Sequence, residues 1–128
     1  VDKVSLTADM DKLTQVFLNL IDNSIEAINS NGKIELKSSF DKERNHIKIS
    51  VIDSGNGIKS ELKVFEPFFT TKSSGTGLGL AIAQKIIEQH RGSIKLVSSE
   101  SGKTVFEIIL PFNGIQNFDK VNYLDKYE

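Results

Sequence analysis

Residues 75–82 read Gly-Thr-Gly-Leu-Gly-Leu-Ala-Ile, with three alternating glycines at the start of a helical pattern. Glycines leave backbone N–H groups exposed, and a helix N-terminus adds its own, so the segment predicts a site for anions such as phosphates. Two other phosphate-binding patterns do not fit. A dinucleotide fingerprint needs a small residue where Leu80 or Ile82 stands, and a Walker A loop ending at residues 102–104 needs a glycine where Val97 stands.

A second group of polar residues lies on a predicted helix. Asn19, Asn23 and Glu26 are spaced i, i+4 and i+7, so they share one face beside the apolar stripe. A carboxamide oxygen is a hard, neutral ligand that suits Mg²⁺ when phosphates supply the remaining charge. Two solvent-facing asparagines on an amphipathic helix explain this pattern equally well, so the helix alone leaves both interpretations open.

A third group, Asp53-Ser54-Gly55-Asn56-Gly57-Ile58, follows a predicted strand. A carboxylate at a strand end can accept a hydrogen bond from a flat ligand edge, such as the amino group of adenine, and the glycines let the backbone approach closely. Asp-Ser-Gly sequences also form ordinary turns, so this motif by itself is weak.

The fourth group is an apolar loop at residues 65–72, Phe-Glu-Pro-Phe-Phe-Thr-Thr-Lys. Three phenylalanines around a proline expose apolar surface unless something covers them. A loop folded back on the core explains the phenylalanines but not the whole string. Lys72 is placed to reach a phosphate.

The composition is that of one ordinary globular domain. The chain has 128 residues, 38% of them hydrophobic and 26% charged, and a net charge of −1. The small net charge gives no field that would attract nucleic acid or an acidic membrane. The absence of cysteine excludes disulfides, thiolate metal sites and cysteine catalysis. No apolar run approaches the roughly 20 residues of a membrane helix, and the start is no signal peptide, so we expect a soluble chain, which can still come from a membrane protein.

Two long helices are expected to carry the asparagine motif and the glycine motif of residues 75–82. Asp9 or Asp11 caps a helix with apolar residues at helical spacing, and Asn31-Gly32 ends it. The second helix runs from Leu78 to His90 and closes at Gly92.

The strands are expected mostly in hairpins. A short strand at residues 4–8 precedes the first helix, and two hairpins follow, at 33–39 with 46–53 and at 93–99 with 103–110. A short helical piece is expected near 59–64. We therefore predict an α+β fold, a two-layer α/β sandwich in which a mixed, mostly antiparallel sheet of about five strands packs on two or three helices. The domain covers residues 1–112, and residues 113–128 form a polar tail.

Taken in their order along the chain, the four motifs resemble the nucleotide-binding boxes of the catalytic and ATP-binding domain of sensor histidine kinases. This domain has the Bergerat-type ATP-binding fold of the wider group that includes gyrase, the Hsp90 chaperone and the MutL repair protein. Residues 15–27 (QVFLNLIDNSIEA) are similar to the N box, 53–58 to the first glycine box, 65–72 to the F box and 75–82 to the second glycine box. Residues 102–111 are similar to the family's closing strand. The resemblance covers about residues 4–112.

The resemblance implies a site for Mg²⁺ and ATP under a mobile lid at residues 59–76. Asn19 and Asn23 would hold Mg²⁺, Asp53 would accept the adenine amino hydrogen, and Thr104 would assist through water. The remaining nucleotide contacts would come from both glycine boxes and the F box: Gly55, Gly57, Ile58, Lys72, Thr76, Gly77, Leu78, Gly79 and Leu80. The chain departs from the family in a short lid, with six residues at 59–64 between two boxes, and in Arg91, where many members have glycine.

The resemblance also implies a reaction. Relatives that hydrolyse ATP have a glutamate where this chain has Asn19, and an amide cannot act as a general base, so transfer of the γ-phosphoryl group is expected rather than hydrolysis. His46 and His90 lack the context of the family's acceptor and are expected to be structural. The acceptor would lie on a separate helical dimerisation and histidine phosphotransfer domain of the parent kinase, with a response regulator downstream.

The resemblance further implies a cytoplasmic, monomeric domain that does not phosphorylate itself alone; its parent can be membrane-anchored. A serine kinase of the anti-sigma-factor type and a non-catalytic nucleotide-binding scaffold remain as alternatives.

Overall fold

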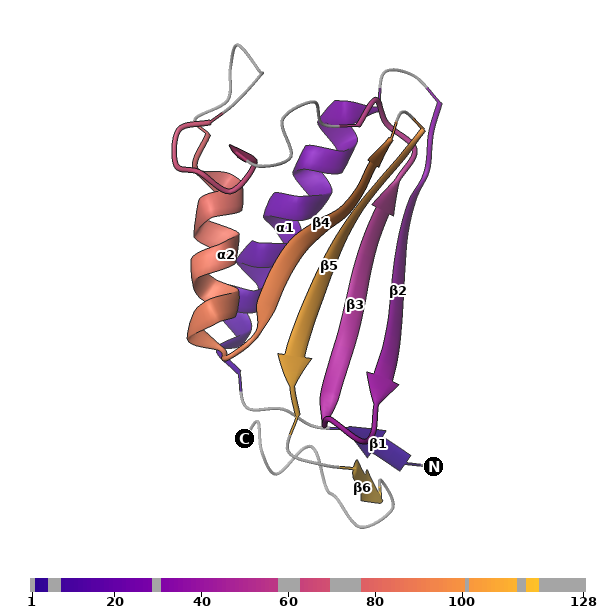
Figure 1. Ribbon diagram of the computed structural model, residues 1–128, viewed down its shortest axis with the longest axis vertical. Helices are drawn as coiled ribbons and strands as arrows, with labels where there is room; N and C mark the ends of the chain where they lie inside the picture. Colours follow the sequence, from indigo (N-terminus) through magenta and orange to yellow (C-terminus); the bar gives the residue numbers. More distant parts are fainter. Residues whose placement is uncertain are drawn as a thin grey trace.

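The computed structural model describes residues 2–4, 8–28, 31–57, 63–69, 77–100, 102–112 and 115–117. Helices α1 (Met10–Ala27) and α2 (Gly79–Gln89) pack side by side against one face of a four-stranded sheet (Figure 1). The other face of the sheet carries no helix within these ranges. The arrangement confirms the predicted α+β class and its two layers.

The sheet consists of two hairpins that lie side by side. β2 (Ile34–Asp41) pairs with β3 (His46–Asp53), and β4 (Ser93–Glu100) pairs with β5 (Lys103–Pro111). β3 also pairs with β5, which gives the order β2-β3-β5-β4. All three pairs are antiparallel, where a mixed, mostly antiparallel sheet was expected, because the contact between the hairpins is antiparallel as well.

The first strand lies outside this sheet. β1 (Asp2–Val4) pairs with β6 (Ile115–Asn117) in a separate two-stranded sheet at one end of the molecule (Figure 1). The main sheet therefore has four strands rather than about five, and part of the segment after residue 112 pairs with the start of the chain. The helical piece expected near 59–64 lies mostly outside the described residues; Lys63 and Val64 belong to a turn in which Glu66 N–H donates to the Lys63 carbonyl (3.0 Å).

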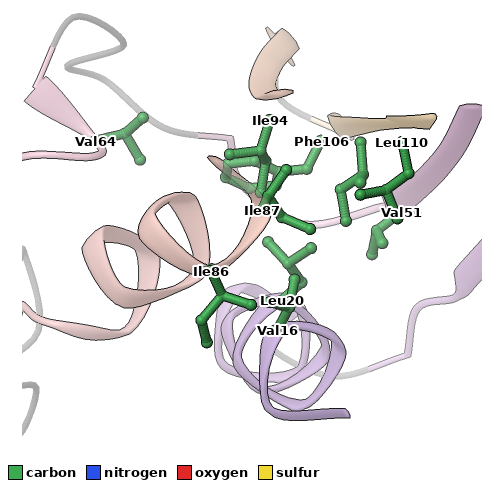
Figure 2. Packing of buried hydrophobic residues seen from close by; sticks show 11 residues of the cluster. Val16, Leu20, Val51, Val64, Ile86, Ile87, Ile94, Phe106 and Leu110 are labelled. Carbon is green, nitrogen blue, oxygen red and sulfur yellow. The ribbon is translucent and has the colours of Figure 1, made fainter. Parts of the chain in front are cut away.

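The core fills the space between the helices and the sheet. Figure 2 shows Val16 and Leu20 of α1, Ile87 of α2 and Phe106 of β5 directed toward one another. Burying a side chain of this size contributes about 1.5–3 kcal/mol of transfer free energy. The most deeply buried large side chains come from both helices and the two central strands: Phe106, Leu20, Ile87, Ile108, Leu110, Val16 and Val51.

The two helices are joined at one end by a capping residue and a histidine. Of the two predicted caps, Asp9 is used: its Oδ1 accepts from Lys12 N–H (3.1 Å). The backbone N–H of Asp9 in turn donates to Nε2 of His90 (2.9 Å), whose Nδ1 lies 2.8 Å from the Ile86 carbonyl oxygen. Nε2 therefore accepts and Nδ1 donates, which fixes the tautomer. His90 thus has the structural role that was expected.

The end of α2 differs in detail from the expected glycine stop. Arg91 adopts the left-handed conformation (φ +65°) and its N–H donates to the Glu88 carbonyl (3.0 Å), while Gly92 N–H donates to the Ile87 carbonyl (2.9 Å). This is a Schellman motif with arginine at the position that glycine usually occupies. Glycine is needed at position 92 for close packing instead, because a Cβ there would lie 2.2 Å from the Ile109 carbonyl oxygen.

Replacing Arg91 with glycine should therefore stabilise the domain by about 1 kcal/mol, because the left-handed conformation costs an L-residue roughly 1–2 kcal/mol and glycine recovers most of it. Urea denaturation followed by circular dichroism would measure the change. The control is Arg91→Ala, which removes the same side chain but keeps a Cβ and should give no comparable gain. Equal stability of the glycine and alanine variants would contradict the explanation.

Candidate nucleotide-binding site

Asp53 lies at the end of β3, on the helix side of the sheet, and only 4% of its surface is exposed. Its Oδ2 accepts a hydrogen bond from the Ser24 hydroxyl (2.9 Å), and its Oδ1 accepts one from Gly55 N–H (2.9 Å). Burying a carboxylate is costly unless it is hydrogen-bonded. These two donors provide that compensation and fix the plane of the carboxylate.

Ser24 was not among the predicted site residues. It is 1% exposed and belongs to α1, four residues after the buried Leu20. Its signal in the sequence was a hydroxyl inside the apolar stripe of an amphipathic helix, where a buried polar group needs a partner. The structure supplies that partner in Asp53.

Thr104 is the partner of Asp53 in the antiparallel register of β3 and β5. It is 3% exposed, and its hydroxyl oxygen has no hydrogen-bond partner in the described part of the chain. A buried hydroxyl without a partner is a place where a water or a ligand atom would be stabilised. Asp53 and Thr104, together with Ser24, thus form a small buried polar group beside the apolar core.

Gly55 and Gly57 hold the loop after β3 against neighbouring backbone. A Cβ on Gly55 would lie 2.7 Å from the Ala27 carbonyl oxygen, and one on Gly57 (φ +79°) would lie 2.3 Å from that of Ser99. Gly102 N–H also donates to the Gly55 carbonyl (2.8 Å). The loop therefore packs closely between the end of α1 and the β4–β5 turn. This packing fixes the position of Asp53.

Asn19 joins the asparagine motif of α1 to the glycine motif of residues 75–82. Its side-chain Nδ2 donates to the Gly79 carbonyl oxygen at the start of α2 (3.1 Å), and both residues are half-buried. Asn23 lies one turn further along α1 and is also half-buried. Leu78 is the N-cap residue of α2, and its own side chain makes no capping hydrogen bond. The asparagine side of α1 therefore lies beside a helix N-terminus that attracts anions.

The apolar loop of residues 65–72 and the glycine motif of residues 75–82 are also in contact. Phe68 N–H donates to the Gly77 carbonyl (2.8 Å), and a Cβ on Gly77 (φ +74°) would lie 2.3 Å from the Phe68 carbonyl carbon. Phe68 itself adopts φ +68°, which is unfavourable for an aromatic residue. Its ring is exposed (74%), whereas Phe65 packs edge-on against Phe106 with ring centroids 6.0 Å apart. Only part of this loop is thus folded onto the core.

Three predicted contacts, Ile58, Lys72 and Thr76, lie outside the described residues. Leu80 is half-buried and packs against the core. Among the described residues, no group of three or more His, Cys, Asp or Glu could hold a metal ion. The predicted magnesium ligands, Asn19 and Asn23, would instead offer neutral amide oxygens.

A hollow of about 620 Å³ lies elsewhere, and Asp41, His46, Lys48 and Glu107 are among its lining residues. By the strand register, Lys48 and Glu107 are on the sheet face away from the helices, since the intervening residues of β3 and β5 are buried in the core. The hollow carries both signs of charge and contains none of the predicted site residues. The four motifs therefore define the candidate site, on the helix side of the sheet.

Comparison with known proteins agrees with this geometry. Residues 8–114 match the family described as histidine kinase-, DNA gyrase B- and HSP90-like ATPases. The sensor histidine kinase ZraS of Escherichia coli (strain K12) is 46% identical over 110 residues, which are 84% of this chain and 23% of that protein. Sporulation kinase C of Bacillus subtilis (strain 168) is 41% identical over 113 residues, 86% of this chain and 26% of that protein. The chain thus spans about a quarter of these relatives.

Solved structures give the same result. The catalytic domain of the histidine kinase ThkA matches with a TM-score of 0.72 and 42% identity, over 83% of this chain and 70% of that one. Full-length ShkA in complex with AMPPNP matches with a TM-score of 0.74 and 26% identity, over 86% of this chain and 23% of that one. The chain therefore belongs to the histidine kinase-, gyrase B- and HSP90-like ATPase family, as the catalytic domain of a sensor histidine kinase. None of its described helices is long and apolar enough to cross a membrane.

Proposed function

We propose that the chain binds ATP with Mg²⁺ and donates the γ-phosphoryl group to a histidine on a separate helical dimerisation domain of its parent kinase, which serves a response regulator. The observation that carries the proposal is the buried pair of Asp53 and Thr104, in which the Thr104 hydroxyl lacks a hydrogen-bond partner among the described residues. No other buried side-chain polar atom described here is left in that state.

Adenine fits this pair chemically. Its amino group donates a hydrogen bond, which the carboxylate of Asp53 can accept, and a water held by Thr104 can complete the contact. The hydrogen bonds from Ser24 and Gly55 orient the carboxylate before a ligand arrives, so little orientational freedom is lost on binding. Glycine at positions 55 and 57 lets the loop backbone lie close to this pair.

The phosphate end of the nucleotide would lie at the start of α2. The N–H groups of the first helical turn and the glycines of residues 77–79 suit phosphate oxygens, and the asparagines of α1 are within reach of the same place. When bound, Mg²⁺ would neutralise charge on the phosphates. Asn19 and Asn23 would hold it with neutral oxygens, and Lys72 and Thr76 are proposed as further phosphate contacts.

Transfer is favoured over hydrolysis because Asn19 cannot take a proton from water. The described residues also offer no internal acceptor, since His90 bridges two helices with both ring nitrogens and His46 is half-buried in β3. We therefore place the accepting histidine on another domain and expect the isolated chain, a monomeric cytoplasmic domain, not to phosphorylate itself.

Phe68 is proposed as a contact to that domain. Its ring is 74% exposed, and the hydrogen bond between Phe68 N–H and the Gly77 carbonyl holds it beside the phosphate end of the site. The double variant Phe68→Ala/Phe69→Ala should bind an ATP analogue with unchanged affinity but phosphorylate a supplied acceptor domain about tenfold more slowly or worse, as for the loss of an interface hot spot. Radiolabelled ATP with the purified acceptor domain would measure the rate.

The matched control is Val97→Ala, which removes an exposed apolar side chain (54%) from β4 and should leave the rate unchanged. Acid treatment of the product tests the reaction itself, because phosphohistidine is acid-labile and phosphoserine is not. Acid-stable product would favour a serine kinase, and no binding of nucleotide would favour a scaffold. Phosphorylation at the normal rate by the double variant would contradict the role of Phe68.

A further inference from the structure

Helix α1 carries a second apolar stripe that the core does not use. It consists of Met10, Thr14, Leu18, Ile21 and Ile25, hereafter the outer stripe. At about 100° per residue these positions fall within an arc of about 80°. From Thr14 onward their spacing is 4, 3 and 4 residues, which is the spacing of the apolar seam in helix–helix packing. The inner stripe, with Val16, Leu20 and Ser24, is the one buried in the core.

The outer stripe is largely exposed. The exposed fractions are 64% for Met10, 56% for Leu18 and 57% for Ile25, and Ile21 is half-buried. Thr14 is exposed, but its hydroxyl donates to the Met10 carbonyl (2.7 Å), so the polar end of this side chain already has a partner. A helix exposing this much aligned apolar surface indicates a contact with another protein element.

The neighbouring edge of the sheet extends this surface. Leu36 and Phe40 of β2 lie opposite Val51 and Ile47 of β3, so they point to the helix side, yet they are 57% and 47% exposed. α2 packs against β4 at the other edge of the sheet (Figure 1). α1 makes only limited contact with β2, so the helical layer leaves Leu36 and Phe40 largely exposed beside α1.

We propose that the outer stripe docks an amphipathic helix of the parent kinase's dimerisation domain, one with basic residues along the edge of its apolar face. The spacing of 4, 3 and 4 residues in the outer stripe is typical of helix–helix packing, so it indicates that the partner segment is a helix. Asp11 and Asp22 are exposed and lie within about 40° of Leu18 around α1. Their carboxylates would attract basic residues along the edge of the partner helix. A second copy of this chain would bring these carboxylates against their own equivalents, which opposes self-association.

This docking surface differs from the one proposed at Phe68. Asn19 lies about 100° around α1 from Leu18 and contacts the start of α2, so the outer stripe faces away from the phosphate end of the site. A helix docked on the stripe is therefore not presented to the phosphoryl group. The inference rests on the proposed function for the identity of the partner, but it concerns a contact that holds the catalytic domain outside the transfer step.

The test uses this chain and the dimerisation domain of its parent kinase as separate purified proteins. The double variant Leu18→Ser/Ile25→Ser should bind that domain about tenfold more weakly by calorimetry, since two exposed anchors are lost. Its affinity for an ATP analogue should be unchanged, which shows that it is folded. The matched control is Val97→Ser, an equally exposed apolar residue on β4, which should bind the domain normally.

Equal affinity of the wild type and the stripe variant for the dimerisation domain would overturn the inference. So would self-association of the isolated chain that the stripe variant abolishes, because the occupant would then be a second copy. A wild type that binds the dimerisation domain through the stripe but never phosphorylates it would refute the proposed function alone. If the wild type phosphorylates the dimerisation domain and the stripe variant binds that domain as tightly as the wild type, only the docking surface would be refuted.

Discussion

Replacing Asp53 by asparagine should weaken binding of an ATP analogue by roughly 10- to 100-fold, because a hydrogen bond to a charged group contributes about 1.5–3 kcal/mol. Asparagine keeps one oxygen, which can still accept from Gly55 N–H, and the Ser24 hydroxyl can rotate to accept from the new amide nitrogen. The fold should therefore survive. The site would lose its charge and gain a donor where the adenine amino group requires an acceptor.

Calorimetric titration with and without Mg²⁺ would measure this loss. The matched control is Asp22→Asn, the same change of charge at an exposed position of α1, which should leave the affinity for nucleotide unchanged. Magnesium should strengthen binding to the wild type if Asn19 and Asn23 hold the ion. Equal affinity of the Asp53→Asn variant and the wild type would exclude Asp53 from the adenine site.

Replacing Phe106 by alanine should lower the free energy of unfolding by about 3–5 kcal/mol, the usual cost of deleting a buried phenylalanine ring. Phe106 is 2% exposed and belongs to the central strand β5, where its ring also packs edge-on against Phe65 of the F box. Since small domains are stable by only about 5–15 kcal/mol, this one change should remove a large part of the stability.

Urea denaturation followed by far-ultraviolet circular dichroism would measure the loss. Val105→Ala is the control, because Val105 is the next residue of β5, points to the opposite face of the sheet and is half-buried. It should cost much less. A loss below about 1 kcal/mol for Phe106→Ala would mean that the core between the sheet and the helices is less tightly packed than described.

The sequence predicted the local elements well, because each is specified by contacts close along the chain. The apolar residues of α1 recur at helical spacing and Asp9 supplies the cap, so the helix could be located without its neighbours. The two hairpins were predicted from alternating strands with polar turns between them. The order of the hairpins, by contrast, depends on contacts between β3 and β5, which are more than fifty residues apart.

The residues around β1 in the sequence did not predict which strand β1 pairs with. A three-residue strand has too few side chains to specify its partner, and the structure pairs it with β6 near the other end of the chain. The pairing of Ser24 with Asp53 was missed for a related reason, since a serine on a helix gives no indication of which strand lies opposite.

The amino-acid sequence by itself determined the family, the four motifs and the residue types of the site, because glycines, asparagines and an aspartate in this order have few other uses. Only the tertiary structure decided which of them meet. It placed Thr104 beside Asp53, Asn19 beside Gly79 and Phe68 beside Gly77, and it put Arg91 rather than Gly92 in the left-handed position. Those choices depend on packing between segments distant in sequence, where burial and hydrogen bonding outweigh local preference.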